Sequence, residues 1–448
     1  MKTSRFIICA VCALLFSAIT AGAQGKYKGV QLTIDHNDGR YAKTDTVKVW
    51  AERLQDDGES LQLYIMENSE WVVKRQPLEL PMGEKVLVLE KLYEEPTAVL
   101  LQVKPGSDHK IFSGVGFIVA PEEFRPGFEE PADFVTFWQD QVKKLRKAKI
   151  KAKLHPVEFP EKQKKYEGKI EAYDLEINMP SGNPVRAYIA WPAGADPKSC
   201  GILINPHGAG VRSSNLGNAI WKAKAFNCIA VDINAHGILN GQPKEFYSDL
   251  NKGELKDYRF TYAEKKEDSY FRLMYLRMQR LLDYLCTLKQ WDGVHVAVDG
   301  TSQGGGQAAA IAGLDPRVGF AALIVPALTD MGGKDAGHNG GWPNRGKFKE
   351  ERDGNYRLAL PYYDGANFLR HYNGILVMEG GMLDTTCPPE CVYSAFNVAV
   401  STDKVIYTNR YREHGEKTLW DDNRKEWKET IGDARKDALK AYLNPSSE

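Results

Sequence analysis

Cysteine is scarce in this chain of 448 residues, which contains seven of them. Two, Cys9 and Cys12, lie inside an apolar stretch at the beginning, which leaves five for the remainder. An odd and widely spaced set in a chain of this length does not form the disulfide framework of small secreted scaffolds. The sequence leaves open whether Cys387 and Cys391 are free, because a disulfide between cysteines four residues apart is geometrically awkward at a helix start.

A net excess of charge is also absent. The chain carries 59 lysines and arginines and 59 aspartates and glutamates, so its formal charge is zero. Proteins that bind DNA or RNA normally carry a basic excess that contacts the phosphates. We therefore expect no nucleic-acid partner for this chain.

Long apolar runs are missing beyond the first 25 residues, so no membrane span is expected there. At the start, two basic residues precede the apolar stretch 6–19, and Ala21-Gly22-Ala23 is the small-residue pattern that signal peptidase recognises. The sequence predicts a cleavable signal peptide over residues 1–23, removed before Gln24, and hence a secreted or periplasmic protein. A retained N-terminal anchor is the alternative.

About 425 residues follow the predicted cleavage site, too many for one ordinary core and suited to two domains. Residues 24–120 contain short runs in which apolar and polar residues alternate, with turn residues between them. This pattern predicts a small antiparallel β-sandwich. Its strands are expected near 30–34, 46–50, 61–65, 86–89 and 98–103. Whether it binds sugar is open: Trp50, Tyr64 and Trp71 fit a sugar-stacking face, but buried sandwich aromatics are commoner.

Residues 121–448 have a different pattern, which begins after a linker at 120–127. Short, nearly continuous apolar runs alternate with helical patterns, among them 133–147 and the longest, 267–289. Such runs are typical of strands buried on both faces of a parallel sheet. They lie at 201–205, 228–233, 294–298, 321–325, 375–378 and 405–407. This domain is therefore predicted to be α/β, with a mostly parallel, doubly wound sheet.

One of these strands leads directly into a glycine-rich turn that contains a serine. The strand ending at Asp299 is followed by Gly300-Thr301-Ser302-Gln303-Gly304 and then by a helical pattern. Strand, Gly-x-Ser-x-Gly and helix in this order form the nucleophile elbow of α/β-hydrolases, where glycines leave room for neighbouring backbone. The helix N-terminus beside the serine favours developing negative charge. We therefore predict an α/β-hydrolase with Ser302 as its nucleophile, the alternative being a mere glycine-rich turn.

The serine hydroxyl needs a histidine to remove its proton, and in this fold the histidine comes last in the chain. Three histidines follow Ser302. His338 precedes the strand that should carry the acid, and His371 is expected at the sheet edge opposite the site. His414 lies in a short loop after the last apolar run. We therefore predict that His414 is the base.

The acid should leave the carboxyl end of the strand before the histidine. That strand is predicted at 375–378, and the loop after it contains Asp384. Asp384 is predicted to orient His414 and to stabilise the imidazolium formed during attack. Two alternatives stay open. Asp384 would instead cap a helix that begins near Pro388, or Glu379 would be the acid although it lies very close to the strand end.

The tetrahedral intermediate of ester hydrolysis needs two backbone N–H donors, the oxyanion hole. Gln303, directly after the nucleophile, is predicted to supply one. The loop 205–210 follows an early strand and contains a His-Gly element like that of lipases and esterases. Its donor is assigned to Ala209. His207 of the same element is expected to be structural rather than catalytic.

Together these motifs resemble the acetyl xylan esterases and cephalosporin C deacetylases, carbohydrate esterase family seven. The resemblance covers about residues 121–448 and rests on Ser-Gln-Gly-Gly from Ser302 and Asp-x-x-Cys-Pro-Pro from Asp384. Tyr362-Tyr363-Asp364 and the segment 131–138 add to it. The resemblance implies deacetylation of xylan-derived or other small acetylated carbohydrates, without metal or cofactor. It leaves open a homo-oligomer, since some relatives form rings.

Positions around the site depart from the family pattern. The family's Arg-Gly-Gln element appears only as Asn234-Ala235-His236-Gly237, so its arginine is missing. Ala209 stands where a tyrosine usually follows the oxyanion His-Gly, and the His-Glu pair is here His414-Gly415-Glu416. A front β-sandwich is also unusual in the family. No triad member is lost, so the departures bear on acyl and sugar preference rather than on ester chemistry.

Two other functions fit parts of the sequence. A prolyl-oligopeptidase-like serine peptidase shares the fold and the triad order, but such enzymes usually carry an N-terminal propeller much larger than residues 24–120 can form. A catalytically silent carbohydrate-binding relative is the non-enzymatic alternative, and the complete set of Ser302, Asp384 and His414 argues against it. The sequence therefore favours a secreted serine esterase that deacetylates carbohydrate through an acyl-enzyme.

Overall fold

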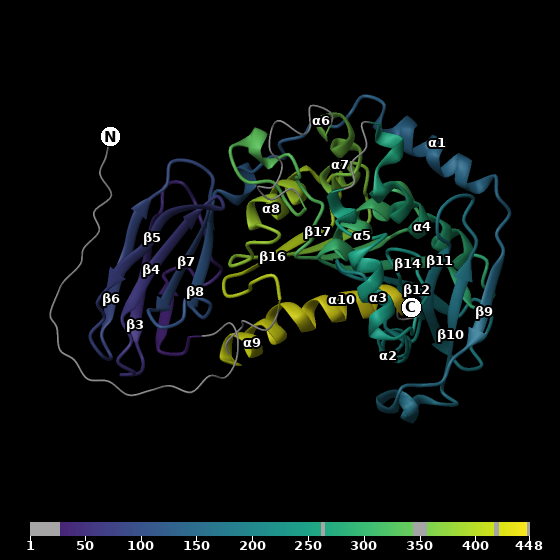
Figure 1. Ribbon diagram of the computed structural model, residues 1–448, viewed down its shortest axis with the longest axis horizontal. Coiled ribbons are helices and arrows are strands. Elements are labelled where there is room, and N and C mark those ends of the chain that lie inside the picture. Colours follow the sequence, from purple (N-terminus) through teal and green to yellow (C-terminus); the bar gives the residue numbers. More distant parts are fainter. Residues whose placement is uncertain (1–26, 261–264, 344–355, 416–420, 446–448) are drawn as a thin grey trace.

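The computed structural model of the protein describes residues 27–260, 265–343, 356–415 and 421–445. They form an all-β part and a larger part with a central sheet and helices, which lie side by side (Figure 1). The predicted signal peptide lies outside the described residues. Within these described ranges, every helix is too short or too polar to cross a bilayer.

The all-β part consists of two sheets, one with the strand order β1-β3-β6 and one with the order β2-β8-β7-β4-β5. Their strands are β1 (Val30–Ile34), β2 (Arg40–Tyr41), β3 (Thr46–Arg53), β4 (Leu61–Glu67), β5 (Glu70–Leu78), β6 (Lys85–Leu92), β7 (Thr97–Pro105) and β8 (Ser113–Val119). Alternate residues point inward, so Val47 and Val49 of β3 share a core with Leu101 and Phe117. The predicted sandwich is therefore present, with one departure: the short pair β2–β8 is parallel.

The central sheet has nine strands in the order β17-β16-β15-β14-β12-β13-β11-β10-β9. Strands β17 to β13 in this order are parallel, and β11, β10 and β9 continue the sheet antiparallel. Their bounds are β9 (Ala152–Pro156), β10 (Ile170–Ile177), β11 (Val185–Pro192), β12 (Cys200–Pro206), β13 (Ile229–Ile233), β14 (Trp291–Thr301), β15 (Phe320–Ile324), β16 (Ile375–Gly381) and β17 (Lys404–Asn409). Since β12 lies between β13 and β14, the strand order reverses there, which is where open α/β sheets bind ligands.

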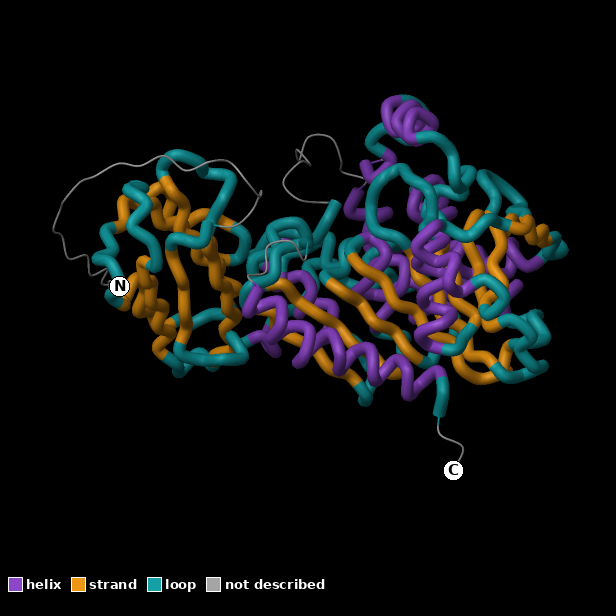
Figure 2. Tube along the Cα trace, turned by 90° about the horizontal axis from the view of Figure 1, so that it is seen from below, coloured by secondary structure: helices purple, strands orange, loops and turns teal. Residues whose placement is uncertain are grey.

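Helices cover both faces of this sheet (Figures 1 and 2). One face packs against α4 (Tyr270–Leu285), α5 (Gln303–Leu314), α7 (Gly365–Leu369) and α8 (Pro389–Val398). The other packs against α2 (Leu216–Phe226) and α10 (Asp433–Leu443). Further helices are α1 (Phe134–Arg146), α3 (Lys244–Lys252), α6 (Tyr356–Ala359) and α9 (Asp421–Trp427). Neighbouring strand residues point to opposite faces, so Ile202 and Ile204 join the first core and Leu203 the second.

The predicted α/β class, with a mostly parallel sheet behind a β-sandwich, is confirmed. The helix predicted at 133–147 is α1, and the one predicted at 267–289 is the shorter α4. Strands β9, β10 and β11 were not predicted: β9 and β10 carry many polar, partly exposed residues, while the buried apolar run 187–191 of β11 was overlooked. The domain boundary at residue 120 stays a prediction.

The five-stranded sheet lies against the loops that follow β16 and β17. An apolar cluster joins the two parts, and its members are Met66, Leu100, Phe112 and Leu383. In addition, the Gly116 N–H on β8 donates to the Arg410 carbonyl at 2.9 Å. The sandwich therefore packs against the two loops that carry Asp384 and His414.

Candidate active site

Ser302 lies at the sharp turn between β14 and α5, with φ 59° and ψ −127°. Residues other than glycine rarely adopt this backbone conformation, and it is costly unless neighbouring structure enforces it. The Ser302 N–H donates to the Ile324 carbonyl at 2.9 Å, and the Ser302 carbonyl accepts from the Gly305 and Ala327 N–H groups at 2.8 and 2.9 Å. These bonds hold the serine at the carboxyl edge of the sheet.

Two glycines of this turn are required because other backbone atoms come very close. A Cβ atom at Gly300 would lie 2.2 Å from the Gly304 carbonyl oxygen. One at Gly304 would lie 2.2 Å from the Pro206 carbonyl oxygen at the end of β12. Contacts this short are repulsive, so only glycine fits at either position. The Gly-x-Ser-x-Gly pattern thus has a direct steric cause in this fold.

The structure brings the three residues predicted as a triad together. Ser302 Oγ lies 2.8 Å from His414 Nε2, and His414 Nδ1 lies 2.8 Å from Asp384 Oδ2. A carboxylate accepts hydrogen bonds, so Nδ1 carries a proton and the Nε2 lone pair faces the serine hydroxyl. The Asp384 side chain is fully buried, whereas 30% of the His414 side chain is exposed. This geometry allows the imidazole to remove the serine proton; the catalytic roles remain predictions.

Asp384 also organises its own loop. Its second oxygen, Oδ1, accepts from the Thr386 and Cys387 N–H groups at 2.7 and 2.8 Å. The N-cap residue of α8 is Pro388, so Asp384 closes a turn ahead of the helix instead of capping it. Because its two oxygens have separate partners, the carboxylate is fixed by backbone on one side and faces His414 on the other.

Glu379, the rival acid, is fully buried at the end of β16 and takes part in a different network. Its oxygens accept from Arg412 (2.6 Å), Trp427 (2.8 Å), Asn409 (3.2 Å) and Arg435 (3.4 Å). Arg412 lies two residues before His414, and its carbonyl accepts from the Leu383 N–H at 2.9 Å. The Glu379–Arg412 pair therefore ties the loop of the predicted base to the loop of the predicted acid. The sequence analysis missed this role of Arg412.

Replacing Arg412 by alanine should destabilise the protein strongly. Its side chain is only 2% exposed and that of Glu379 is 0% exposed, so the substitution leaves a buried carboxylate without its main partner. Such losses typically lower the free energy of unfolding by about 3–5 kcal/mol, and Arg435 should keep this one near the lower value. Urea unfolding of Arg412→Ala measures the effect. A matched control is Lys428→Ala, which breaks an exposed ion pair and should change stability by under about 0.5 kcal/mol. A loss for Arg412→Ala as small as the control's would contradict the bracing role.

The loop and the helix of the two predicted oxyanion donors lie next to Ser302. Gln303 is the first residue of α5, where N–H groups have no acceptor within the helix. Gly208 lies against the serine, since a Cβ atom there would be 3.6 Å from the Ser302 Cβ. The carbonyls of Gly208 and Ala209 both accept from the Arg212 guanidinium, at 3.2 and 2.7 Å. Arg212 thus fixes the loop that holds Ala209, whose role as donor stays a prediction.

His207 fixes this loop through hydrogen bonds of both ring nitrogens. Its Nδ1 lies 2.8 Å from the Gly208 carbonyl, and its Nε2 lies 3.3 Å from the Ala235 N–H. A carbonyl only accepts and an N–H only donates, so the ring is neutral with its proton on Nδ1. Burial, assisted by Arg212, lowers the pKa of His207 to about 4. Both nitrogens are used within the protein, which agrees with the structural role expected for His207.

His236 is a second support, which the sequence analysis did not predict. It is fully buried, with Nδ1 2.7 Å from the Tyr270 hydroxyl and Nε2 3.3 Å from the Gly210 carbonyl. Its ring packs edge-on against Tyr258 at 4.6 Å, and the Tyr258 hydroxyl donates to the Gln303 side chain at 2.6 Å. Burial lowers the pKa of His236 to about 3. His236 belongs to the element that lacks the family's arginine. It contacts the loop of Ala209 directly at Gly210, and it contacts helix α5 indirectly, through Tyr258 and Gln303.

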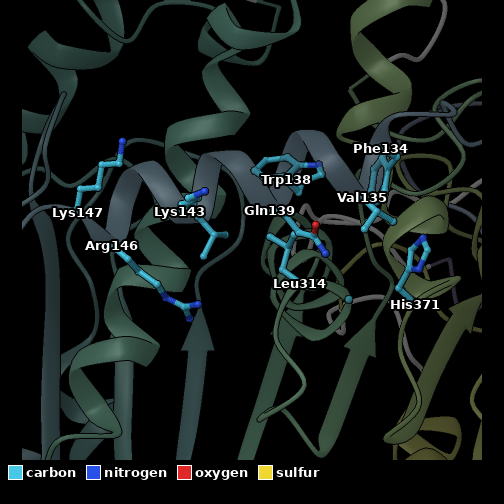
Figure 3. Close-up of a pocket in the computed structure, with 11 residues that line it drawn as sticks. Phe134, Val135, Trp138, Gln139, Lys143, Arg146, Lys147, Leu314 and His371 are labelled. Carbon is cyan, nitrogen blue, oxygen red and sulfur yellow. The ribbon is translucent and has the colours of Figure 1, made fainter.

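The other two candidate histidines lie away from Ser302 in separate environments. His338 is buried, with Nε2 3.3 Å from Asp330 Oδ2. His371 pairs with Glu130 at 2.9 Å and lines a cavity of about 600 Å³ between α1 and the end of α5 (Figure 3). That cavity contains none of the predicted site residues.

Comparison with known proteins places this architecture in a family. The family described as acetyl xylan esterase (AXE1) matches residues 120–431. A curated relative, acetyl esterase Axe7A of Xylanibacter ruminicola, is 28% identical over 302 residues, which are 66% of this chain and 65% of that protein. The chain therefore spans slightly less than two thirds of the length of this relative.

Two solved structures share the fold. The acetyl xylan esterase from Paenibacillus sp. R4 is 23% identical, with a TM-score of 0.58 over 72% of this chain and 98% of that one. Acetyl xylan esterase 1 from Thermoanaerobacterium sp. JW/SL YS485 is 22% identical, with a TM-score of 0.55 over the same shares. The predicted α/β-hydrolase fold is confirmed by these likenesses.

Proposed function

The chain belongs to the acetyl xylan esterase family, and from this we propose that it is a serine esterase that removes acetyl groups from carbohydrate. The single observation that carries the proposal is the hydrogen-bonded series from Ser302 through His414 to Asp384, with 2.8 Å at each step. Such a series is the arrangement that makes a serine hydroxyl nucleophilic. The test is loss of esterase activity when Ser302 is replaced.

The proposed reaction has two halves. His414 Nε2 takes the Ser302 hydroxyl proton as Oγ bonds to the acetyl carbonyl carbon, and the resulting oxyanion accepts from the Gln303 and Ala209 N–H groups. His414 then gives the proton to the sugar oxygen as the ester bond breaks, which leaves an acetyl group on Ser302. In the second half, His414 takes a proton from water as its oxygen bonds to the acetyl carbon. His414 then gives this proton to Ser302 Oγ as the acyl-enzyme bond breaks and acetate leaves. Asp384 orients the imidazole and stabilises its charged form.

Acetyl esters should be strongly preferred over peptide amides. The serine peptidase alternative shares the fold and triad order, so the discriminating measurement is kcat/KM for acetylated xylo-oligosaccharides against that for peptide 4-nitroanilides. We expect clear acetate release from the first and no detectable nitroaniline from the second. Cleavage of the anilides at a comparable kcat/KM would favour the peptidase instead.

The sugar preference is the least constrained part of the proposal. The family and the curated acetyl esterase support acetylated carbohydrate, while the altered residues around the loop at 208–212 and at His236 leave the particular sugar open. Acetate release from acetylated xylan, pectin and chitin oligomers compares the candidates under one assay. The proposal expects xylan-type substrates to react fastest.

We also propose export through the signal peptide at 1–23, which N-terminal sequencing of the mature protein tests.

A further inference from the structure

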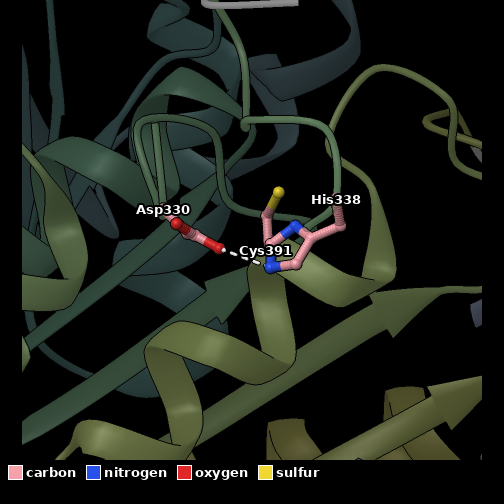
Figure 4. A group of neighbouring side chains, drawn as sticks. All are labelled: Asp330, His338 and Cys391. Carbon is pink, nitrogen blue, oxygen red and sulfur yellow. Dashed lines mark ion pairs between the residues drawn. The ribbon is translucent and has the colours of Figure 1, made fainter. Parts of the chain in front are cut away.

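A second cluster of reactive side chains lies buried between the connection after β15 and the first turn of α8. Asp330 is in the loop after β15, His338 follows a short turn in the same connection, and Cys391 is in the first turn of α8 (Figure 4). Their ligand atoms all lie within 4.8 Å of one another. All three side chains are almost wholly removed from solvent. The cluster takes no part in the proposed ester chemistry.

The hydrogen bonds around His338 leave one of its nitrogens without a use. Nδ1 lies 3.1 Å from the Asn339 carbonyl, and because a carbonyl only accepts, Nδ1 carries the proton. In a neutral ring Nε2 then presents a lone pair, and this lone pair faces Asp330 Oδ2 at 3.3 Å. Both atoms can offer a lone pair to a group placed between them.

Two buried polar atoms that face each other have no hydrogen bond of regular geometry among the described residues: Asp330 Oδ2 and His338 Nε2. Ser394 lies one turn after Cys391 on α8, and its hydroxyl is close enough to act as a donor to Asp330. The other Asp330 oxygen accepts from the Gly127 N–H at 2.8 Å. Unpaired polar atoms are rare in protein interiors, and two that face each other indicate that another group belongs between them.

The charge of the cluster favours a cation over a neutral group. Two acidic side chains, Asp330 and Asp364, lie close together here, and both are buried. Asp364 itself has the backbone N–H groups of Asp330, Met331 and Ala366 as donors. A divalent cation would neutralise the Asp330 carboxylate and a Cys391 thiolate together.

We propose that Asp330, His338 and Cys391 form a binding site for one zinc ion, with a structural role. One oxygen, one imidazole nitrogen and one thiolate are ligands that Zn²⁺ accepts, whereas Mg²⁺ and Ca²⁺ prefer oxygen alone. Tetrahedral zinc with bonds of about 2.0–2.3 Å places its ligand atoms about 3.3–3.7 Å apart, and the Asp330–His338 separation of 3.3 Å agrees. On binding, Cys391 gives up its thiol proton and Asp330 any proton it holds, and both protons leave to solvent.

The ion would hold together two segments of the chain, one of which directly follows the loop of Asp384. It would join the connection after β15 to α8, and α8 begins directly after the loop of Asp384. The three ligands are buried and leave no exposed position for a substrate, which favours a structural over a catalytic ion. The family resemblance implied no metal, and the three ligands lie far apart in the chain, so no ligand-spacing motif marks them.

Metal analysis of the full-length protein tests this site. After growth with added zinc and dialysis, we expect about one zinc per chain, and at least about tenfold less in Cys391→Ala and in His338→Ala. The matched control is Cys387→Ala, because Cys387 belongs to a different cluster with Asp384 and His414; it should keep its zinc. No zinc in the unmodified protein, or zinc lost only from Cys387→Ala, would overturn the proposal. The first result would point to buried water at the cluster.

A second measurement takes its main result from the unmodified protein, so that result does not depend on how a variant folds. Zinc should raise the melting temperature of the unmodified chelator-treated protein by at least about 3 °C, and Cys391→Ala should show no rise. Cobalt(II) in place of zinc should give a thiolate-to-cobalt absorption band that Cys391→Ser loses. No rise and no band would contradict the site. Neither readout uses ester hydrolysis, so the result is independent of the proposed function.

Discussion

Replacing Ser302 by alanine is expected to lower kcat for 4-nitrophenyl acetate at least about 10⁴-fold. The substitution removes the only oxygen that His414 Nε2 contacts in the series, so no acyl-enzyme can form. The fold should survive, because the backbone bonds of residue 302 do not use its side chain. Steady-state rates and the pre-steady-state burst measure the effect, and both should disappear.

A serine elsewhere in the chain provides the control. Ser199 is exposed, and its hydroxyl donates to the Asp196 carbonyl at 2.7 Å, before β12 begins. Ser199→Ala should hydrolyse the ester at the normal rate. If Ser302→Ala keeps full activity while Ser199→Ala behaves normally, Ser302 is not the nucleophile and the proposed reaction is wrong.

Replacing Asp384 by asparagine is expected to lower kcat by about 10⁴-fold. Asparagine keeps an oxygen for the Thr386 and Cys387 N–H groups, so the loop should hold its shape. Its amide NH₂ would then face His414 Nδ1, which must become an acceptor. The imidazole proton moves to Nε2, and the ring can no longer take the serine proton. The measurement is kcat for 4-nitrophenyl acetate, with the melting temperature recorded in parallel.

The chain contains a closely matched control for this substitution. Asp292 also accepts from two backbone N–H groups with Oδ1, those of Val294 and His295, and also lies 2.8 Å from a histidine Nδ1 with Oδ2, that of His295. It lies at the start of β14, at the opposite end of this strand from Ser302. Asp292→Asn should leave kcat within about twofold of normal. An equal loss in both variants would mean that the Asp384 effect comes from general destabilisation.

Much of the candidate site was predictable because it follows from the order of elements along the chain. A nucleophile elbow must lie between a strand and a helix, and the carboxyl ends of parallel strands meet at one edge. Ser302, Asp384 and His414 each follow a recognisable strand, so their meeting required no knowledge of side-chain packing. The Gly300 and Gly304 positions were visible through the Gly-x-Ser-x-Gly motif, although the crowding at Gly304 comes from the distant Pro206 carbonyl.

The parts that were missed depend on contacts between distant segments. Arg412 contacts Glu379 across 33 positions, and His236 contacts Tyr270 across 34. No periodicity or spacing marks such pairs, because each residue alone fits an ordinary loop or strand end. The same holds for the contact of Leu383 with the sandwich, which makes the front domain part of the support of the site. Only the three-dimensional arrangement shows that these residues connect the loops of Asp384 and His414 to their surroundings.

Labelling with a fluorophosphonate tests the central claim most directly, because the probe bonds to a serine only if a neighbouring base has activated it. The native protein is treated with the probe, its intact mass is measured, and the modified peptide is sequenced by mass spectrometry. We predict one adduct per chain, located on Ser302 and absent from His414→Ala. No adduct, or an adduct on another residue, would contradict the proposed serine esterase.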